Sequence, residues 1–458
     1  MQTELIEPAT GEPLTHVASG TAEDVDRAVR AADGAFSGAW RRIHTRERAR
    51  LLHKLADLIR ANKEDLARAE TRNVGKPIRD SRDEVGLAAN VFDYYAGTTN
   101  KVGGQTIPAA APGVLLSFRE PVGVCGIIVP WNFPIAITAW KSAPALAMGN
   151  TVVLKPAEQT PLTAIRLAEL ALEAGIPEGV FTVVTGAGSV VGDALVRHPL
   201  VRKIAFTGST EVGRNVMRIA ADDIKRVSLE LGGKSANLLF ADCDFDRAVD
   251  SAATSALGNA GQDCCARSRI LVDESIYDRF VPALVARFGR VRVGDPMNDD
   301  TEMGPLISAP HRDRVMQYID SGNAEGATLA SGGQAIRLSG FYLEPTIFTD
   351  VNSTMTIARE EIFGPVVTVM RFRDEEEAVR LANDSPYGLS GSIWTRDLGR
   401  ALRVTRAVQT GNLSINSGSS VHLEGPFGGM KQSGLGRELG LQALDAYTEW
   451  KSVYIDVG

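Results

Sequence analysis

Two adjacent cysteines, Cys264 and Cys265, are the residues of this sequence with the clearest chemical potential. They follow a Gly-Gln-Asp turn in a chain of 458 residues that contains only four cysteines. A carboxylate, Glu230, lies upstream in the run Leu-Glu-Leu-Gly-Gly-Lys-Ser at residues 229–235. An ionised thiol is a strong nucleophile and a carboxylate can act as a base, so these residues suffice for covalent acyl chemistry. The alternative is that the cysteines are small buried apolar residues and Glu230 is a surface charge.

The composition of the chain argues against several other classes of protein. Hydrophobic residues make up 44% of the chain and the net charge is −7, which disfavours a nucleic-acid or anionic-membrane partner. Cys125 and Cys243 complete the set of cysteines, which is too small for a disulfide framework. No Cys/His group has metal-ligand spacing, so we expect no metal. The N-terminus has neither a basic nor an apolar signal segment, and a reduced cytoplasmic setting is expected.

One segment, residues 122–140, carries no charged side chain over a length that could span a membrane. Gly126, Pro130 and Pro134 would interrupt a helix in its middle. We therefore expect a buried strand, a loop and the start of a helix, and no membrane segment.

The elements that must position these residues follow from the hydrophobic pattern. A short strand and turn are expected at 5–20, helices from Thr21 to about residue 100, and β-structure at 103–120. Between 122 and 230, apolar strands alternate with helices, and a second alternating stretch covers 236–432. Such alternation predicts parallel sheets covered on both faces, with ligands at the carboxyl ends of the strands. The β-rich tail, 446–457, is expected to pair with 103–120 or with another subunit.

Seven motifs, in order along the whole chain, resemble those of the NAD(P)-dependent aldehyde dehydrogenase superfamily. They are Pro-Trp-Asn-Phe-Pro (130–134), Leu-Lys-Pro-Ala-Glu-Gln-Thr (154–160), Phe-Thr-Gly-Ser-Thr-Glu-Val-Gly (206–213), the Glu230 run, the run 259–266 around Cys264, Glu-Glu-Ile-Phe-Gly-Pro (360–365) and Pro-Phe-Gly-Gly (426–429). The resemblance implies an α/β fold with a Rossmann-type NAD-binding domain (1–102 and 121–232) and an α/β catalytic domain (233–432). A small β oligomerisation element (103–120 and 433–458) would complete a homodimer or homotetramer.

The resemblance also implies catalytic roles for four residues. Cys264 matches the nucleophile, which forms a thiohemiacetal and then a thioester with the aldehyde carbon. Glu230 matches the base that activates the hydrolytic water. Asn132 matches the group that, with the Cys264 backbone N–H, holds the oxyanion, although it could be a mere turn former. Lys141 is a further candidate on the oxyanion side, with a solvated lysine as its alternative.

A weak cofactor signal can be read directly from residues 208–213, where small residues follow an apolar strand and open a helix, as at pyrophosphate sites. The resemblance extends this cofactor set, and it matches Lys155 and Glu158 to residues that hold the adenosine ribose. A carboxylate there repels a 2′-phosphate, so NAD is preferred over NADP. The implied cofactor residues are Val129, Pro130, Trp131, Lys155, Ala157, Glu158, Gly188, Gly208, Ser209, Gly213, Leu231, Glu361 and Phe363.

The implied substrate pocket contains Phe133, Trp140, Asp263, Cys265 and Phe427. Asp263 and the pair at 83–84 resemble the aminoaldehyde and betaine aldehyde dehydrogenase branch, where acidic groups would attract a cationic tail. The alternative is that Asp263 is a turn residue and Glu84 is exposed. The loop 416–425 should shape the far end of the pocket and does not closely follow that branch.

The sequence thus predicts NAD-dependent oxidation of an aldehyde, such as an aminoaldehyde or a semialdehyde, to the acid. Acyl transfer to coenzyme A is an alternative that Glu230 disfavours, because family members with that activity generally lack this glutamate. A non-catalytic NAD-binding relative is a second alternative, disfavoured by the intact set of Asn132, Glu230 and Cys264. Oxidation of Cys264 with Cys265 is a further hypothesis for switching the enzyme off.

Overall fold

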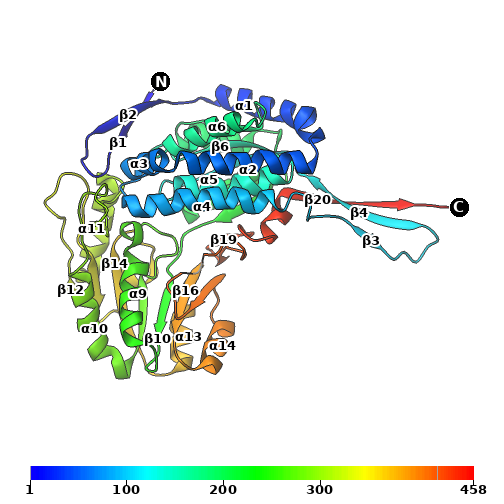
Figure 1. Ribbon diagram of the computed structural model, residues 1–458. Coiled ribbons are helices and arrows are strands. Elements are labelled where there is room, and N and C mark those ends of the chain that lie inside the picture. Colours follow the sequence, from blue (N-terminus) through cyan, green and yellow to red (C-terminus); the bar gives the residue numbers. More distant parts are fainter. Residues whose placement is uncertain (1, 420) are drawn as a thin grey trace.

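The computed structural model describes residues 2–419 and 421–458, which form two sheet-based bodies and a projecting arm (Figure 1). The first body is built on a six-stranded sheet of order β19-β9-β8-β5-β6-β7. All neighbours pair in parallel except β19, which is antiparallel to β9. The strands are β5 (Val124–Ile128), β6 (Thr151–Lys155), β7 (Phe181–Val183), β8 (Val201–Thr207), β9 (Arg226–Glu230) and β19 (Gly434–Leu435).

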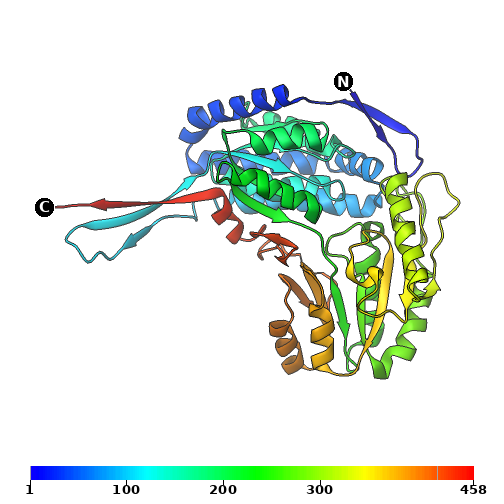
Figure 2. The same ribbon diagram turned by 180° about the vertical axis from the view of Figure 1, so that it is seen from behind.

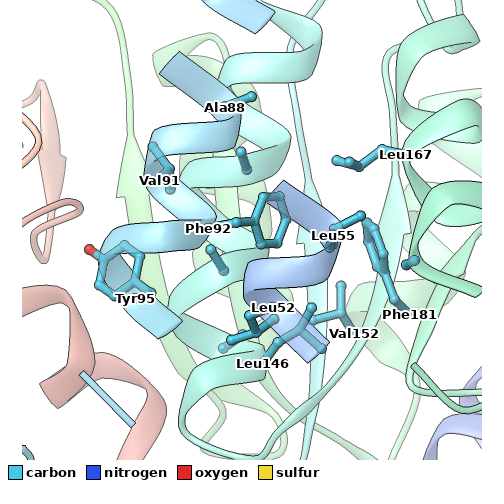
Figure 3. Close-up of a cluster of buried hydrophobic side chains, with 14 of the residues drawn as sticks. Leu52, Leu55, Ala88, Val91, Phe92, Tyr95, Leu146, Val152, Leu167 and Phe181 are labelled. Atoms are coloured by element: carbon cyan, nitrogen blue, oxygen red, sulfur yellow. The ribbon is translucent and has the colours of Figure 1, made fainter. Parts of the chain in front are cut away.

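Helices cover both faces of this sheet because its central strands are apolar on both sides. In β5, Cys125 and Ile127 face one core, whereas Val124 and Ile128 face the other. Figure 3 shows part of the first core, where Leu52, Phe92 and Val152 come together from two helices and a strand. The helices of this body are α1 (Ala22–Ala35), α2 (Thr45–Ala61), α3 (Lys63–Val74), α4 (Ile78–Ala96), α5 (Pro134–Ala147), α6 (Leu162–Ala174), α7 (Asp193–Arg197) and α8 (Thr210–Ala221).

The N-terminal segment differs from the expectation of a single strand. It forms an antiparallel hairpin of β1 (Gln2–Ile6) and β2 (Pro13–Ala18). The second strand was missed because β2 has no buried residue and therefore shows no apolar alternation. The expected start of α1 is confirmed: Thr21 and Asp24 form a reciprocal capping box.

The second body is built on a seven-stranded sheet of order β12-β13-β14-β11-β10-β16-β17, which is parallel except at β12. Its alternation of strands and helices confirms the second predicted α/β region. The strands are β10 (Ala236–Leu239), β11 (Arg269–Asp273), β12 (Thr328–Ser331), β13 (Thr346–Thr349), β14 (Val366–Phe372), β16 (Ser390–Trp394) and β17 (Asn412–Ile415). The helices are α9 (Phe245–Leu257), α10 (Glu274–Phe288), α11 (Ala309–Ala324), α12 (Thr356–Arg359), α13 (Glu375–Asn383) and α14 (Leu398–Ala407). A small ladder joins β15 (Tyr387–Gly388) to β18 (Met430–Lys431).

A three-stranded arm, β20-β4-β3, projects away from both bodies in two opposite views (Figures 1 and 2). It consists of β3 (Gln105–Ile107), β4 (Val114–Pro121) and β20 (Thr448–Ile455). The C-terminal strand therefore pairs with 114–121 of its own chain, one of the two destinations left open by the sequence. Gly434–Leu435, within the segment assigned to the oligomerisation element, joins the first sheet as β19.

The uncharged segment 122–140 forms β5, a loop and the first half of α5, as expected. In the described part of the chain, no helix is both long and apolar enough to cross a bilayer.

Candidate active site

The loop that carries the two cysteines runs between α9 and β11 and has an unusual backbone. Asn259 and Ala260 have φ values of +50° and +55°, in the left-handed region that side chains disfavour. Gln262, fully buried, ties the loop down: its Nε2 donates to the Asn259 carbonyl (2.9 Å) and its Oε1 accepts from the Ile307 N–H (2.8 Å). Strained segments held by surrounding structure cluster at functional sites.

Cys264 lies where two cavities meet. The first, of about 230 Å³, contains seven of the predicted cofactor residues together with Asn132, and we call it the groove. Its lining residues are Pro130, Trp131, Asn132, Ile137, Thr207, Gly208, Ser209, Leu231, Gly232, Cys264, His311, Arg314, Glu361, Ile362 and Phe363.

The second cavity, of about 220 Å³, contains all five predicted substrate-pocket residues, and we call it the pocket. Cys264, Ile137 and Thr207 line both cavities, whereas Cys265 lines only the pocket. The lining residues of the pocket are Glu84, Leu87, Phe133, Ala136, Ile137, Trp140, Thr207, Glu230, Asp263, Cys264, Cys265, Val421, Phe427 and Glu438. Val421 belongs to the loop predicted to shape the pocket, and Ser420 of that loop lies outside the described residues.

Asn132 is held rigidly beside the cysteine loop. Its Nδ2 donates to the Gln262 carbonyl (2.9 Å), and its own carbonyl accepts from Asn259 Nδ2 (3.0 Å). The side chain is buried and contacts a segment 130 residues away, so it does more than form a local turn. One amide hydrogen is used in this contact, which leaves the second for a ligand.

Glu230 ends β9 inside the protein, so the surface-charge alternative is wrong for this residue. Neither carboxylate oxygen has a hydrogen-bond partner among residues 2–419 and 421–458. Burial, followed by the charge of Glu438, raises the pKa of Glu230 well above its usual 4.5, and Lys141 acts in the opposite direction. A Cβ at Gly428 would lie 2.8 Å from Glu230 Oε1, so glycine at that position leaves room for the carboxylate.

Lys141 is fully buried, which rules out the solvated-lysine alternative. It forms an ion pair with Glu438, whose side chain is only 5% exposed. Since Glu438 lines the pocket beside Glu230, the Lys141–Glu438 pair sets the electrostatic surroundings of that carboxylate. An oxyanion role for Lys141 stays a prediction.

Cys264 is partly exposed, whereas Cys265 is buried. A hydrogen bond with Cys265, burial and the charge of Asp263 raise the pKa of Cys264 well above its usual value. The resting side chain is therefore a thiol. Asp263 Oδ1 accepts from the Cys265 N–H (2.8 Å), and burial raises the pKa of this carboxyl. Asp263 thus acts locally as a turn residue and also faces the pocket.

An aromatic frame stands at one wall of the groove. The Trp131 ring lies edge-on to Phe363 and His311, with centroid separations of 5.2 and 5.4 Å. His311 Nε2 lies 2.7 Å from the Phe363 carbonyl, and Phe363 itself has a φ of +58°. Sequence reasoning missed His311 and Arg314, because neither lies in a motif that resembles the family.

Glu361 enters the groove next to the glycine run that follows Glu230. Its Oε1 accepts from the Gly233 N–H (2.9 Å), and a Cβ at Gly232 would meet its Oε2 at 2.1 Å. Glycine at position 232 is therefore required for this approach. Burial raises the pKa of Glu361 to about 7.

The other predicted cofactor residues line neither cavity. Lys155 is buried at the carboxyl end of β6, where its Nζ donates to the Pro156 carbonyl (2.9 Å), and Glu158 is exposed on the turn that follows. Gly188 is exposed at the start of a helical turn, and Gly213 packs against Leu231 in α8. Val129 and Ala157 follow β5 and β6 directly, so all six lie in the first body.

The two acidic residues at 83–84 have different surroundings, because one faces solvent and the other faces the pocket. Asp83 is exposed and lines neither cavity, whereas Glu84 lines the pocket, so the exposed alternative is wrong for Glu84. Lys76 Nζ lies 2.5 Å from Glu84 Oε2, 3.7 Å from Glu70 Oε1 and 4.6 Å from the centroid of the Phe133 ring. Glu84 already has a buried cationic partner.

The geometry defines a class of protein: an α/β enzyme whose thiol lines both a groove with predicted cofactor residues and a pocket with the predicted substrate residues. The aldehyde dehydrogenase family model matches residues 1–453. An aldehyde dehydrogenase of Aspergillus niger is 46% identical over 456 residues, covering 99% of this chain and 92% of that protein. A betaine aldehyde dehydrogenase of Bacillus subtilis is 45% identical over 456 residues, covering 98% and 93%.

A solved structure points in the same direction. Betaine aldehyde dehydrogenase from Staphylococcus aureus, in complex with NAD+, has a TM-score of 0.98 at 43% identity, covering 100% of this chain and 92% of that chain. This chain belongs to the aldehyde dehydrogenase family. The predicted family, the α/β fold and the aldehyde oxidoreductase activity are confirmed, as is the resemblance to the betaine aldehyde dehydrogenase branch.

Proposed function

We propose that this protein oxidises an aldehyde to the carboxylic acid with NAD, through a covalent intermediate on Cys264. One observation carries the proposal: Cys264 lines both the groove and the pocket, so one thiol can reach a bound aldehyde and a bound cofactor. The S. aureus relative with NAD+ bound supports the choice of cofactor.

The groove fits a dinucleotide in its chemistry. Ser209 caps α8, a helix of 12 residues, and the backbone N–H groups of such a terminus favour a pyrophosphate. Thr207 lines the groove, and its buried Oγ1 lacks a hydrogen-bond partner within the described residues. Glu361 and the frame of Trp131 and Phe363 would hold the nicotinamide ribose, and Lys155 with Glu158 the adenosine ribose. When bound, NAD accepts a hydride from the substrate carbon.

The residues of the chain act in sequence on the aldehyde. The Cys264 thiol gives its proton to solvent, and the sulfur attacks the carbonyl carbon, forming a C–S bond and moving the π-bond electrons onto the oxygen as an oxyanion. Asn132 Nδ2 and the Cys264 N–H stabilise this oxygen, a contribution of ~3–4 kcal/mol in comparable sites. Once the hydride has left, a thioester remains on Cys264. Glu230 then takes a proton from water, which attacks the thioester and releases the acid and the thiol.

An aldehyde with a cationic tail is the substrate class we favour. Asp263 lines the pocket and has no ion-pair partner in the described ranges, whereas Lys76 already neutralises Glu84. Phe133, Trp140 and Phe427 are among the apolar walls of the pocket, and its other acidic residues are Glu84, Glu230 and Glu438. Of the two acidic features read from the sequence, Asp263 is therefore the one available to a cation.

We also propose a homodimer or homotetramer held by the arm, in a reduced cytoplasmic compartment and without a nucleic-acid partner. The arm exposes Phe118, Trp450, Tyr454 and Ile455, an apolar set that a second copy would cover. The four cysteines are free thiols, and the net charge is −7. The domain division at 102/103, 120/121, 232/233 and 432/433 is part of the proposal.

The test is NADH formation with NAD across aminoaldehydes, betaine aldehyde, succinic semialdehyde, aliphatic aldehydes and benzaldehyde, each with and without coenzyme A. We expect turnover independent of coenzyme A, with cationic aldehydes preferred. The Asp263→Asn variant should lower the ratio of kcat/KM for cationic over neutral aldehydes by about tenfold, the effect of one lost charge contact. An unchanged ratio would contradict the role of Asp263, and no turnover despite NAD binding would contradict catalysis.

A further inference from the structure

We propose that Asp263, Cys264 and Cys265 form an inhibitory site for a thiophilic divalent cation such as Zn²⁺, which blocks the nucleophile reversibly. A carboxylate oxygen and the two sulfur atoms all lie within 4.8 Å of one another. Among the described residues, this is the one group of three or more His, Cys, Asp or Glu side chains placed to hold a metal. The cation bound here would inhibit the enzyme, and the proposed oxidation itself uses no metal.

The donor set suits this class of cation. Zinc binds thiolate sulfur at ~2.3 Å and carboxylate oxygen at ~2.0–2.2 Å, so tetrahedral ligand atoms stand roughly 3.5–4 Å apart. The present separations need to shrink by only about 1 Å, which side-chain rotation can supply. Hard cations such as Mg²⁺ prefer six oxygen ligands and are disfavoured by two sulfurs.

A second observation points to a ligand at this place. Glu230 lines the same pocket, is only 4% exposed, and neither of its oxygens has a hydrogen-bond partner in the described part of the chain. Lys141 and Lys76 are engaged with Glu438 and Glu84, so no lysine of the described residues pairs with Glu230 or Asp263. The pocket therefore holds an unpaired carboxylate, Glu230, in addition to the three ligands, and water would supply the fourth ligand.

The proton balance of binding makes the inhibition pH-dependent. Each thiol releases one proton to solvent as its sulfur bonds to the metal, and no electron is transferred. Affinity should therefore rise with pH, and a chelator should restore the activity. A disulfide between Cys264 and Cys265 would instead be restored by a phosphine reductant and would resist the chelator.

The first experiment titrates Zn²⁺ into metal-free enzyme kept reduced with a phosphine, with Mg²⁺ as the comparison ion. Cys265→Ser and Asp263→Asn are each scored against their own metal-free rate, and both should weaken inhibition at least about tenfold. Cys243→Ser, which alters a buried cysteine outside both cavities, should be inhibited like the parent. Equal sensitivity of Cys265→Ser, Asp263→Asn and the parent would overturn the proposal.

The second experiment measures binding without activity. Co²⁺ added to the parent should give a thiolate-to-cobalt charge-transfer absorption of two-thiolate intensity, falling to about half in Cys265→Ser. A one-thiolate spectrum in the parent would contradict the proposed site with three ligands. Inhibition rests on the proposed role of Cys264, whereas the cobalt spectrum does not, so failures of the two proposals are distinguishable.

Discussion

The Lys141 ammonium and the Glu438 carboxylate form a buried ion pair next to Glu230, and residues 297 positions apart thereby control the proposed base. Replacing Lys141 with Met should raise the pKa of Glu230 further, because Lys141 lowers that pKa more than the second nearby cation, Arg437, does. The rising limb of the pH–rate profile should move to higher pH. Unfolding should cost about 3–5 kcal/mol less, since Glu438 is left buried without its partner.

The matched control is the double variant Lys141→Met with Glu438→Gln, which removes both charges. It should recover part of the lost stability and bring the pH–rate profile back toward the parent. Identical profiles in the parent and in Lys141→Met, measured by NADH formation from pH 6 to 10, would show that the pair does not govern Glu230.

Replacing Glu230 with Gln should separate the two halves of the reaction. The variant should release about one NADH per active site in a rapid burst and then stall, because no carboxylate remains to activate water. In the parent, steady turnover should rise with pH as Glu230 ionises. Stopped-flow absorbance measures both, and steady turnover of Glu230→Gln at the parent rate would exclude Glu230 as the base.

The same carboxylate gives a stability prediction of definite sign. The pKa of Glu230 is higher in the folded than in the unfolded chain, so the folded state binds more protons above pH 4.5. The contribution of Glu230 to the free energy of unfolding therefore has its maximum below that pH and decreases as pH rises through the pKa of the folded state. Glu230→Gln has no group that titrates at this position, so it does not lose this stability. Its melting temperature should therefore rise relative to that of the parent as pH increases. A constant difference would contradict the raised pKa.

Replacing Cys264 with Ala should abolish the oxidation, with a loss of at least about 1,000-fold, because the intermediate cannot form. NAD affinity, measured by calorimetry, should stay within about threefold, since the thiol occupies only one edge of the groove. Cys243→Ala, remote from both cavities, serves as the control with full activity. Retained oxidation in Cys264→Ala would transfer the nucleophile role to another residue.

Charging the arm should disrupt assembly. Trp450, 54% exposed on β20, is replaced with Glu, which should yield smaller species by sedimentation because a buried interface cannot accommodate the unpaired charge. Glu449→Gln, a neighbour whose partner Arg226 lies in the same chain, is the milder comparison. An unchanged sedimentation coefficient in Trp450→Glu would exclude this face of the arm from the interface.

Local patterns in the sequence were sufficient to predict the strands of the two parallel sheets and to single out the cysteine loop. Runs such as β5 and β6 are buried at every position, which is the pattern of strands in a parallel sheet covered on both faces. Glu230 and Cys264 could be placed at the site because each lies in a compact motif.

Properties that depend on distant partners could not be predicted. The burial of Lys141 is stabilised by Glu438, which no local pattern connects to it. Which of residues 83 and 84 faces the pocket depends on the rotation of α4, and a difference of one residue turns a helical side chain by about 100°. The partner of Glu84, Lys76, lies before the helix begins.

The pairing of β4 with β20 has a consequence for how the protein is made. A ribosome synthesises residues 114–121 long before it reaches their pairing partner, residues 448–455. In the same way, β9 is synthesised long before its antiparallel neighbour β19. During synthesis the first body therefore stands with an unpaired sheet edge, an uncompensated Lys141 and an open arm. A chain that stops before residue 434 lacks β19, Glu438 and β20 together, so a late nonsense mutation would remove structural support from the active site while leaving Cys264 and Glu230 in place.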